Sequence, residues 1–411
     1  MSDQTCCEEF GRLDRRTVLR AGALAGTTTM VGSAVVTTRP ASAASADSVL
    51  VVLSLRGAAD GLSLVVPYAD PVLRAARPGI HVPESELLAT DGFFGLHPAL
   101  DPLLPTWRAG RMAAIHAAGM LVPNRSHFAA MEEVEDAAPG SGTRSGWLNR
   151  LVGDLPGGSP LQGFSLGEGV LPISLGGPEP VFASGSVDNV GLLGEKQGKF
   201  RRERERSLSM LWNRDRTVLG DAMRQAMAAV DDFQPAQQQS SRVGTYPSSD
   251  LGRALADVAR VVRGDVGVEV VTVDQGNWDM HVNVGNLSGG RMVKQAADLA
   301  QALAAFLDDV RAFRDEVTVV VLSEFGRRVK QNTNRGLDHG HGSVMLVLGA
   351  GVRGGYYASW PGLENTEDAD LAVTTDYRQV LAEVVHRRFP AAAVSSVFPG
   401  LVYDPVGFMR G

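Results

Sequence analysis

Three short segments in the second half of the chain place carboxylates and imidazoles close together. The first contains Asp279 and His281, the second contains Glu324, and the third contains His339 and His341 on either side of a glycine. Carboxylate oxygens and imidazole nitrogens are donors that zinc, manganese, magnesium and calcium take from proteins. The residue types therefore predict a divalent-metal site. The glycine between the late histidines leaves open which of the two faces the metal.

Each segment also has a structural explanation of its own. Asp279 could cap backbone amides, Glu324 could pair with Arg327 or Arg328, and the late histidines could be solvated. However, Asp338 directly precedes the late histidines, and a carboxylate that orients an imidazole is common at metal sites. All three segments fall within residues 274–342, and each adjoins a predicted strand. Their joint occurrence favours one shared site.

Two earlier segments add groups suited to ester chemistry. Ser126 could act as a nucleophile or cap a helix, and Arg125 or Arg56 could hold an anion. Asp60 follows another predicted strand and could join the metal ligands. Three further histidines are interpreted more readily as core or surface residues than as ligands: His97, His116 and His127.

These segments are expected at strand ends of an α/β fold. Short β-branched apolar runs predict buried strands at 48–55, 112–116, 268–273, 317–322 and 344–348. Helical patterns cover 96–108, 200–230, 251–262, 292–313 and 376–389, the last with Thr375 as expected cap. Helices that alternate with such strands indicate a mostly parallel central sheet flanked by helices on both faces. Because parallel strands end on a common edge, the polar segments are expected to meet there.

Residues 1–46 have the features of a twin-arginine signal peptide. Arg15-Arg16 is followed by Thr-Val-Leu-Arg, then by a weakly apolar stretch and small-residue cleavage sites at 41–46. Both cysteines, Cys6 and Cys7, lie in this segment, so an exported form would contain no disulfide and no thiolate ligand. The pattern predicts export by the twin-arginine machinery to the periplasm or the exterior.

The remaining residues, 47–411, are predicted to form a single domain. A content of 44% hydrophobic and 21% charged residues is that of a globular protein, and the net charge of -7 gives no basic field for nucleic acid. No long apolar run without charges follows the leader, so no stable membrane anchor is expected. Residues 156–198 and 234–249 are predicted as loop-rich insertions.

Several motifs together resemble the DUF1501 family of exported bacterial proteins. They are LRGAADGLSLVVPY, DGFFGLHPAL, NRSHFAAM, GNWDMH, VVVLSEFGRRV and LDHGHGSVMLVLGAGVRGG, and they extend over essentially all of the chain after the leader. That family is similar, more distantly, to the alkaline phosphatase and sulfatase superfamily. The resemblance implies an alkaline phosphatase-like fold and hydrolysis of phosphate or sulfate esters.

The order of these residues along the chain indicates which of them would match each metal ligand and the nucleophile of the superfamily. The implied metal ligands are Asp60, Asp279, His281, Glu324 and either His339 or His341, and the implied nucleophile is Ser126. Phe325 stands where the superfamily has a histidine, and Glu324 stands where it has an aspartate. The resemblance therefore implies one metal ion more readily than a complete two-metal centre.

Two functions remain open at this point. The first is a metal-dependent hydrolase in which Ser126 attacks a phosphate or sulfate ester while Arg125 or Arg56 holds the anion. The second is an exported protein without catalytic activity that keeps the scaffold and binds an anionic small molecule, a cell-envelope polymer or a partner protein. Phe325 and the 156–198 insertion favour this second function. A redox role for a histidine-bound transition metal has no support beyond the histidines themselves.

Overall fold

The computed structural model describes residues 28–31, 34–37, 46–140, 145–167, 171–191 and 201–411. Its centre is a sheet of eleven strands in the order β1-β2-β8-β7-β9-β3-β10-β11-β6-β12, with β13 paired to β6. The strands are β1 (Thr28–Val31), β2 (Ala34–Thr37), β3 (Val49–Leu55), β6 (Met112–Gly119), β7 (Gly163–Leu166), β8 (Phe182–Ser184), β9 (Val270–Gln275), β10 (Val317–Leu322), β11 (Ser343–Gly349), β12 (Gly355–Tyr357) and β13 (Thr375–Asp376). A separate two-stranded sheet pairs β4 (Val65–Val66) with β5 (Gly95–Leu96).

The sheet is mostly parallel, as predicted, but one central strand is reversed. Strands β8, β7, β9, β3 and β10 run in the same direction. Strand β11 is antiparallel to both β10 and β6, so β6 again runs parallel to β10. The N-terminal end of β11 therefore lies at the edge where β3, β6, β9 and β10 have their C-terminal ends. This edge is called the functional edge below.

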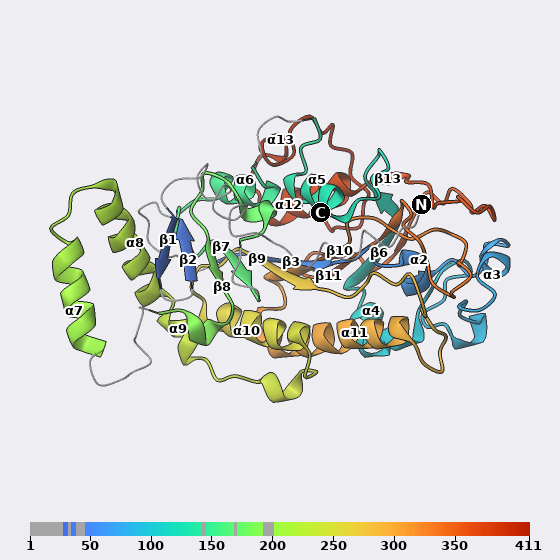
Figure 1. Cartoon of the computed structure of the whole chain (residues 1–411), viewed down its shortest axis with the longest axis horizontal. Helices are drawn as coiled ribbons and strands as arrows, with labels where there is room; N and C mark the ends of the chain where they lie inside the picture. Colours follow the sequence, from blue (N-terminus) through green and yellow to red (C-terminus); the bar gives the residue numbers. More distant parts are fainter. Residues whose placement is uncertain (1–27, 32–33, 38–45, 141–144, 168–170, 192–200) are drawn as a thin grey trace.

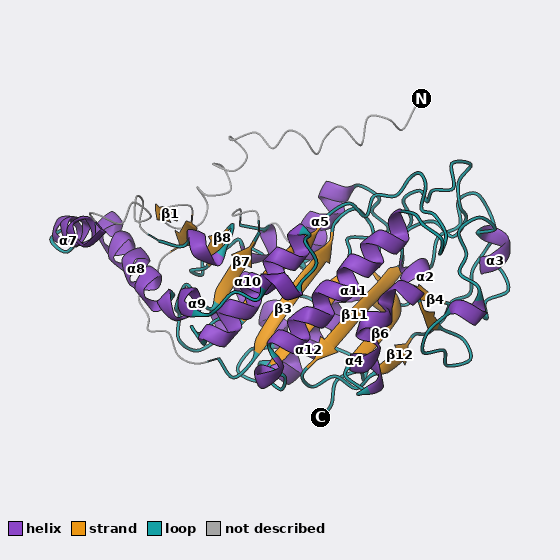
Figure 2. Ribbon diagram, turned by 90° about the horizontal axis from the view of Figure 1, so that it is seen from below, coloured by secondary structure: helices purple, strands orange, loops and turns teal. Residues whose placement is uncertain are grey.

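Helices cover both faces of the sheet (Figure 1). One face carries α5 (His127–Asp136), α6 (Trp147–Asp154), α12 (Tyr377–Arg388) and α13 (Val394–Val397). The other carries α4 (Leu104–Arg108), α10 (Asp250–Gly264) and α11 (Arg291–Asp309). The short helices α2 (Gly61–Leu64) and α3 (Leu73–Ala76) follow β3. Figure 2 shows α7 (Arg201–Trp212) and α8 (Val218–Asp232) extending from one end of the sheet, with α9 (Gln234–Gln238) beside them.

The central strands are apolar throughout because both of their faces are covered. Along β3, Val51 and Leu53 pack into the core that contains α10 and α11. Leu50 and Val52 point the other way, into the core that contains α6 and α12. Successive side chains of a strand alternate between faces, so a strand buried on both sides needs an unbroken apolar run. This is the pattern of the sequence at 48–55.

Two predicted helices differ from those observed. The segment 96–108 consists of the end of β5, a 3₁₀ helix at Pro98–Leu103 and the short α4, since prolines at 98, 102 and 105 remove backbone donors. The segment 200–230 is divided into α7 and α8, and Thr217 caps α8 by accepting from Gly220 N. Asp376, not Thr375, caps α12 through Arg378 N at 2.9 Å.

The predicted insertions contain regular structure. Residues 156–198 include β7, β8 and two short 3₁₀ helices, while 168–170 and 192–198 lie outside the described residues. Residues 234–249 include α9 and a 3₁₀ helix at Val243–Thr245. Arg260 lies against this second segment and donates to the carbonyl groups of Gln237 and Gln239. The 234–249 segment is therefore attached to α10 and is not a free linker.

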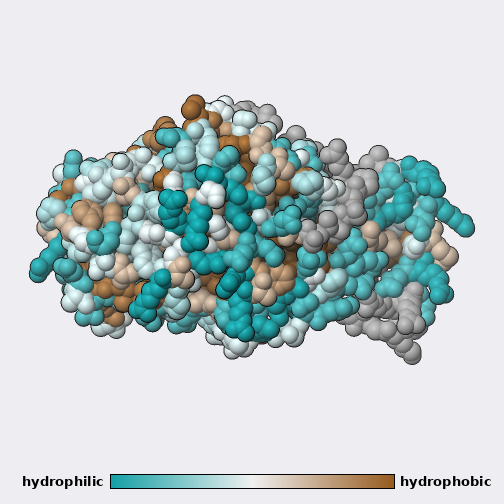
Figure 3. Space-filling view, turned by 180° about the vertical axis from the view of Figure 1, so that it is seen from behind, coloured by the Kyte–Doolittle hydropathy of each residue, from teal (hydrophilic) through white to brown (hydrophobic). Residues whose placement is uncertain are grey.

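Part of the predicted leader lies within the described residues. Strands β1 and β2 pair with each other, and β2 pairs antiparallel with β8 through Val35 and Val36. The paired arginines, both cysteines and the expected cleavage sites up to residue 45 lie outside the described residues. Within the described part of the chain, no helix has the length and apolar character needed to cross a membrane. The face shown in Figure 3 is largely hydrophilic, with hydrophobic residues in separate patches.

Candidate metal centre

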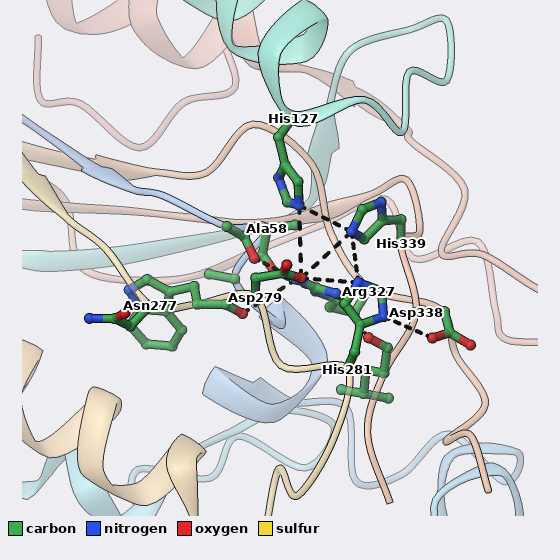
Figure 4. Close-up of polar contacts among 12 residues, drawn as sticks. Ala58, His127, Asn277, Asp279, His281, Arg327, Asp338 and His339 are labelled. Atoms are coloured by element: carbon green, nitrogen blue, oxygen red, sulfur yellow. Dashed lines mark hydrogen bonds and ion pairs between the residues drawn. The ribbon is translucent and has the colours of Figure 1, made fainter. Parts of the chain in front are cut away.

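Three loops at the functional edge bring histidines and acidic residues together. His127 is the first residue of α5, in the connection that follows β6. Asp279 and His281 follow β9, and Glu324 follows β10. His339 precedes β11 and reaches the same edge because β11 is reversed. The side chains of His127, Asp279, His281 and His339 are named the His–Asp cluster here (Figure 4).

The donor atoms of the His–Asp cluster converge. Nε2 of His339 lies 3.0 Å from Nε2 of His127 and 3.0 Å from Nε2 of His281. Oδ1 of Asp279 lies 3.1 Å from Nε2 of His281 and 3.6 Å from Nε2 of His339. The same oxygen is 3.8 Å from Nε2 of His127. Donor atoms of His127, Asp279 and His339 lie within 4.8 Å of one another, a spacing at which they could hold one metal ion.

Each imidazole is oriented by an acceptor at its other nitrogen. Nδ1 of His127 lies 2.7 Å from Oε1 of Glu324. Nδ1 of His281 lies 3.0 Å from Oδ1 of Asp338. Nδ1 of His339 lies 2.9 Å from the carbonyl oxygen of Arg125. Since all three acceptors lack a proton to give, we assign the ring N–H to Nδ1 in each histidine.

This assignment leaves three Nε2 lone pairs and a carboxylate oxygen facing one another. A neutral imidazole has a single N–H, and here that group is already donated away from the centre of the cluster. Lone pairs about 3 Å apart repel unless a cation or proton lies between them. The His–Asp cluster is therefore a set of donors arranged for a positive charge.

The spacing of His127, Asp279 and His339 fits a metal ion, and His281 lies beside them as a further nitrogen donor. In tetrahedral zinc sites the ligands lie about 2.0–2.1 Å from the metal, which separates donor atoms by about 3.3 Å. The separations among Nε2 of His127, Nε2 of His339 and Oδ1 of Asp279 are 3.0, 3.6 and 3.8 Å, and they bracket this value. Three nitrogens and one oxygen suit zinc or a similar transition metal better than calcium or magnesium, which prefer oxygen ligands.

Electrostatics within the cluster follow from the same contacts. Burial alone would lower the pKa of His127, but the carboxylates of Asp279 and Glu324 outweigh it and raise this pKa to about 9, so that a proton takes the Nε2 position when no metal ion is there. Asp279 raises the pKa of His281. Burial opposes the ionisation of Asp279, yet its imidazole partners and Arg327 hold its pKa far below the usual range. The carboxylate is thus ionised and attracts positive charge.

Arg327 joins the loops that carry the cluster. Its fully buried guanidinium donates to the carbonyl oxygens of Ala58 at 2.7 Å, Leu337 at 2.9 Å and Gly57 at 2.5 Å. It also donates to Oδ1 of Asp279 at 2.6 Å. A planar group with several donors can bridge separate backbone segments in fixed directions. Arg327 thereby holds the loops after β3 and β9 and the loop before β11 in one arrangement.

Glu324, predicted as a metal ligand, acts through His127. Its Oε1 accepts from Nδ1 of His127 and from the amides of Gly57 at 2.9 Å and Ala58 at 3.0 Å. Burial would raise the pKa of Glu324, but these donors lower it below its usual value. Gly57 has φ +108, and a Cβ there would lie 2.6 Å from the backbone nitrogen of Asp279. Only glycine permits this approach.

Phe325 forms one wall of the site. Its ring stacks on His127 with centroids 5.0 Å apart and lies 5.2 Å from the ring of His339. His127 is buried, whereas Asp279 and His281 are partly exposed. The cluster is therefore closed on the side of α5 and open to solvent on the side of the β9 loop.

Two other predicted ligands have different partners. Both carboxylate oxygens of Asp60 accept from Arg77, at 2.5 and 2.9 Å, in a fully buried pair, so Asp60 does not join the cluster. His341 lies 2.7 Å from the carbonyl oxygen of Met120 through Nε2. Of the two late histidines, His339 faces the cluster and His341 anchors the chain after β6.

The three residues predicted to act on an ester lie near the functional edge with distinct environments. Arg56 is paired with Glu135 at 2.5 Å and with Asp274 at 3.0 Å. Arg125 is paired with Asp370. Each arginine thus already has a carboxylate partner. Ser126 is exposed, lies immediately before His127 and is the N-cap residue of α5, but its side chain makes no capping hydrogen bond.

The sequence interpretation did not include His127 among the ligands. The sequence did contain an indication that His127 lies at the site. His127 follows Ser126 directly in the connection after β6, and β6 ends at the functional edge. Asp338 was expected to orient one of the late histidines, and it orients His281 instead. That pairing spans 57 residues and has no local signature in the sequence.

The chain belongs to the DUF1501 family, described as proteins of unknown function, whose model matches residues 47–393. No curated protein matches the sequence. A solved structure with similarity is the C-terminal periplasmic domain of EcEptC from Escherichia coli in complex with Zn. The identity is 11%, the match covers 79% of this chain and 77% of that chain, and the TM-score is 0.31. A similarity of this size carries no argument about fold or function.

Proposed function

We propose that this chain is an exported, metal-dependent hydrolase of phosphate or sulfate esters with an alkaline phosphatase-like fold. One metal ion would be held by His127, Asp279, His281 and His339. The observation that carries the proposal is the convergence of three Nε2 atoms on one carboxylate oxygen, each imidazole being oriented by a separate acceptor. Residues 1–46 would serve as the twin-arginine export signal.

A metal ion at this position would polarise an ester oxygen and stabilise the charge that develops on it. The nucleophile in this proposal is the hydroxyl of Ser126. Two features support it: Ser126 is exposed, and it directly precedes the buried ligand His127. Attack would form a bond from Oγ to phosphorus or sulfur and break the bond to the leaving oxygen, and the proton that the hydroxyl gives up would pass to that leaving oxygen. Water would then release the covalent intermediate.

The N-terminus of α5 is the proposed anion-binding element. The first-turn amides of a helix have no acceptor within the helix, and their dipoles favour negative charge. In α5 the Ser126 side chain does not occupy them. Arg56 and Arg125 are a weaker choice than the sequence suggested, because both already pair with carboxylates.

Metal content tests the proposal first. We expect purified protein incubated with zinc or manganese and then desalted to retain about one equivalent. Asp279→Ala and His281→Ala should retain much less, whereas His386→Ala, on exposed α12 surface, should retain the wild-type amount. Retention below about 0.2 equivalents by the folded wild type would count against a metal centre.

Turnover of phosphate, sulfate and phosphonate esters tests the chemistry. The proposal expects metal-dependent hydrolysis that Ser126→Ala abolishes while metal content stays the same. The second candidate function, an exported protein that binds an anionic glycan or envelope polymer without catalysis, is favoured by Phe325 against the imidazoles and by the paired arginines. Metal retention with no turnover of any ester class would favour this candidate.

A further inference from the structure

The two loops that flank the His–Asp cluster expose large hydrophobic side chains. Leu121 is 62% exposed and Val122 is 70% exposed, in the connection between β6 and α5. Phe128, the residue after His127, is 40% exposed, and Val282, the residue after His281, is 47% exposed. These four side chains are named the apolar rim. All four lie in the chain segments that carry His127 and His281, and exposed apolar residues beside a site mark a binding surface more often than scattered ones do.

Two hydrogen bonds fix the Leu121 side of the rim beside the cluster. His341 holds the carbonyl of Met120 at 2.7 Å, and the cluster residue His339 holds the carbonyl of Arg125 at 2.9 Å. Leu121 and Val122 lie between these anchors, so the chain that carries them is attached at both ends to the loop before β11. The rim is therefore positioned by the same residues that build the cluster.

The flanking segments also lack charge. Residues 117–124 and 282–290 contain no Asp, Glu, Lys or Arg, although 21% of the chain is charged. Two arginines border these segments: Arg125 is paired with Asp370, and Arg291 donates to the carbonyl of Asn277. A polyanionic polymer that extended from the cluster would require basic residues along its path. These two segments suit an uncharged, apolar group instead.

We infer that the substrate of the His–Asp cluster is amphiphilic, with an anionic ester group at the cluster and an alkyl or aryl chain lying on the apolar rim. This inference rests on the proposed function, since it assumes that the cluster with its metal binds the anionic group. The chain would cover Leu121, Val122 and Val282, which water otherwise contacts. Burial of each methylene group contributes about fourfold to affinity.

Binding of phosphonates of different chain length to the zinc-loaded full chain tests the inference. Calorimetry would compare methylphosphonate with octylphosphonate below its micelle concentration, with octyltrimethylammonium as the headgroup control. We expect octylphosphonate to bind at least about tenfold more tightly than methylphosphonate, since burial of two methylenes suffices for this. Octyltrimethylammonium should show no metal-dependent binding.

Substitutions in the apolar rim test whether the tighter binding of octylphosphonate depends on these side chains. Leu121→Ser/Val122→Ser should reduce the octyl advantage to less than about threefold and leave methylphosphonate affinity unchanged. Val402→Ser, which alters a side chain that is 85% exposed on the C-terminal segment, is the matched control and should keep the full advantage. Substitutions at such exposed positions leave folding intact, which thermal melting verifies.

The outcomes separate the inference from the proposed function. Metal-dependent binding of both phosphonates with equal affinity overturns the inference and leaves the proposed function standing. Absence of metal-dependent binding of either phosphonate overturns both. An octyl advantage that survives the Leu121/Val122 variant, or that does not depend on the phosphonate group, also overturns the inference. So does a dimer in sedimentation that the variant dissociates, because the rim would then belong to a second copy of the chain.

Discussion

Two clusters of ionisable side chains follow strands of the same sheet, and they differ in how their donor atoms are satisfied. In the first, Asp60 and Arg77 form a two-pronged ion pair, and Arg77 also donates to Ser63 and to backbone carbonyls. In the second, the His–Asp cluster, donor atoms of Asp279 and three histidines face one another. The first is closed by its own protons. In the second, Arg327 donates to Asp279, but the three Nε2 atoms still need a proton or a metal ion between them. Residue types alone do not distinguish a structural cluster from a binding site.

Histidines show the same contrast. His116 uses both ring nitrogens within the fold, since Nδ1 accepts from Ala117 N at 3.0 Å and Nε2 lies 2.8 Å from the carbonyl of Val65. Burial lowers the pKa of His116 to about 4. His127 has its Nδ1 on a carboxylate and its Nε2 directed at other acceptors, and its pKa is raised. A histidine whose two ring nitrogens are satisfied within the fold is a core residue, whereas one whose Nε2 faces other acceptors is available to a proton or a metal ion.

The largest expected effect is on metal affinity. Asp279→Ala removes the carboxylate of the His–Asp cluster. Zinc affinity should therefore fall by more than the 10–100-fold that is typical when a residue hydrogen-bonded to a metal ligand is lost. Competition with a chelator measures it. Unchanged affinity would show that the metal, if bound, is held elsewhere.

Asp60→Ala should lower the stability of the protein and leave its zinc affinity nearly unchanged. It leaves the guanidinium of Arg77 buried without its carboxylate, which costs about 3–5 kcal/mol of unfolding free energy. Zinc affinity of the folded fraction should stay within about threefold of wild type, since Asp60 does not contact the cluster. Denaturant unfolding and zinc titration check both parts. A large loss of zinc affinity would erase the distinction between the clusters.

His116 should make the protein sensitive to acid. Its folded pKa of about 4 lies below the unfolded value of 6.5, so the unfolded state binds more protons between these values. The stabilisation is complete above pH 6.5 and is lost as pH falls toward 4, by about 3 kcal/mol. In His116→Gln this part of the pH dependence should disappear. Parallel melting curves for both proteins from pH 7 to 4 would contradict the assignment.

The smallest effect is expected at Asp338, which orients His281 and is half exposed. Asp338→Ala should weaken zinc binding about 10–100-fold, with little change in stability. Metal titration measures the first quantity and thermal melting the second. An effect as large as that of Asp279→Ala would mean that Asp338 itself binds the metal.

Much of the fold followed from the sequence because buried strands and long amphipathic helices have distinct periodicities. The direction of each strand could not be predicted from the sequence, because the apolar pattern of a buried strand such as β11 is the same whether the strand is parallel or antiparallel to its neighbours. The prediction that polar segments meet at the C-terminal ends of parallel strands describes Asp279 and Glu324, which follow β9 and β10. His339 reaches that edge only through the reversal. The partner of Asp60 lies 17 residues away on Arg77, and no local pattern marks that pair.

The reversal of β11 also sets what can be altered without loss of the fold. Because β10 and β11 are antiparallel neighbours, the 20 residues at 323–342 connect adjacent strands whose last pair in register is Val321 with Leu346. A turn of a few residues would join the same strands, since hairpins need no crossover. That exchange would remove His339, Glu324 and Arg327 together and keep the pairing of the sheet. In this protein a single hairpin connection thus carries one imidazole of the cluster and two of its supporting side chains, while the other three cluster residues lie in two other connections.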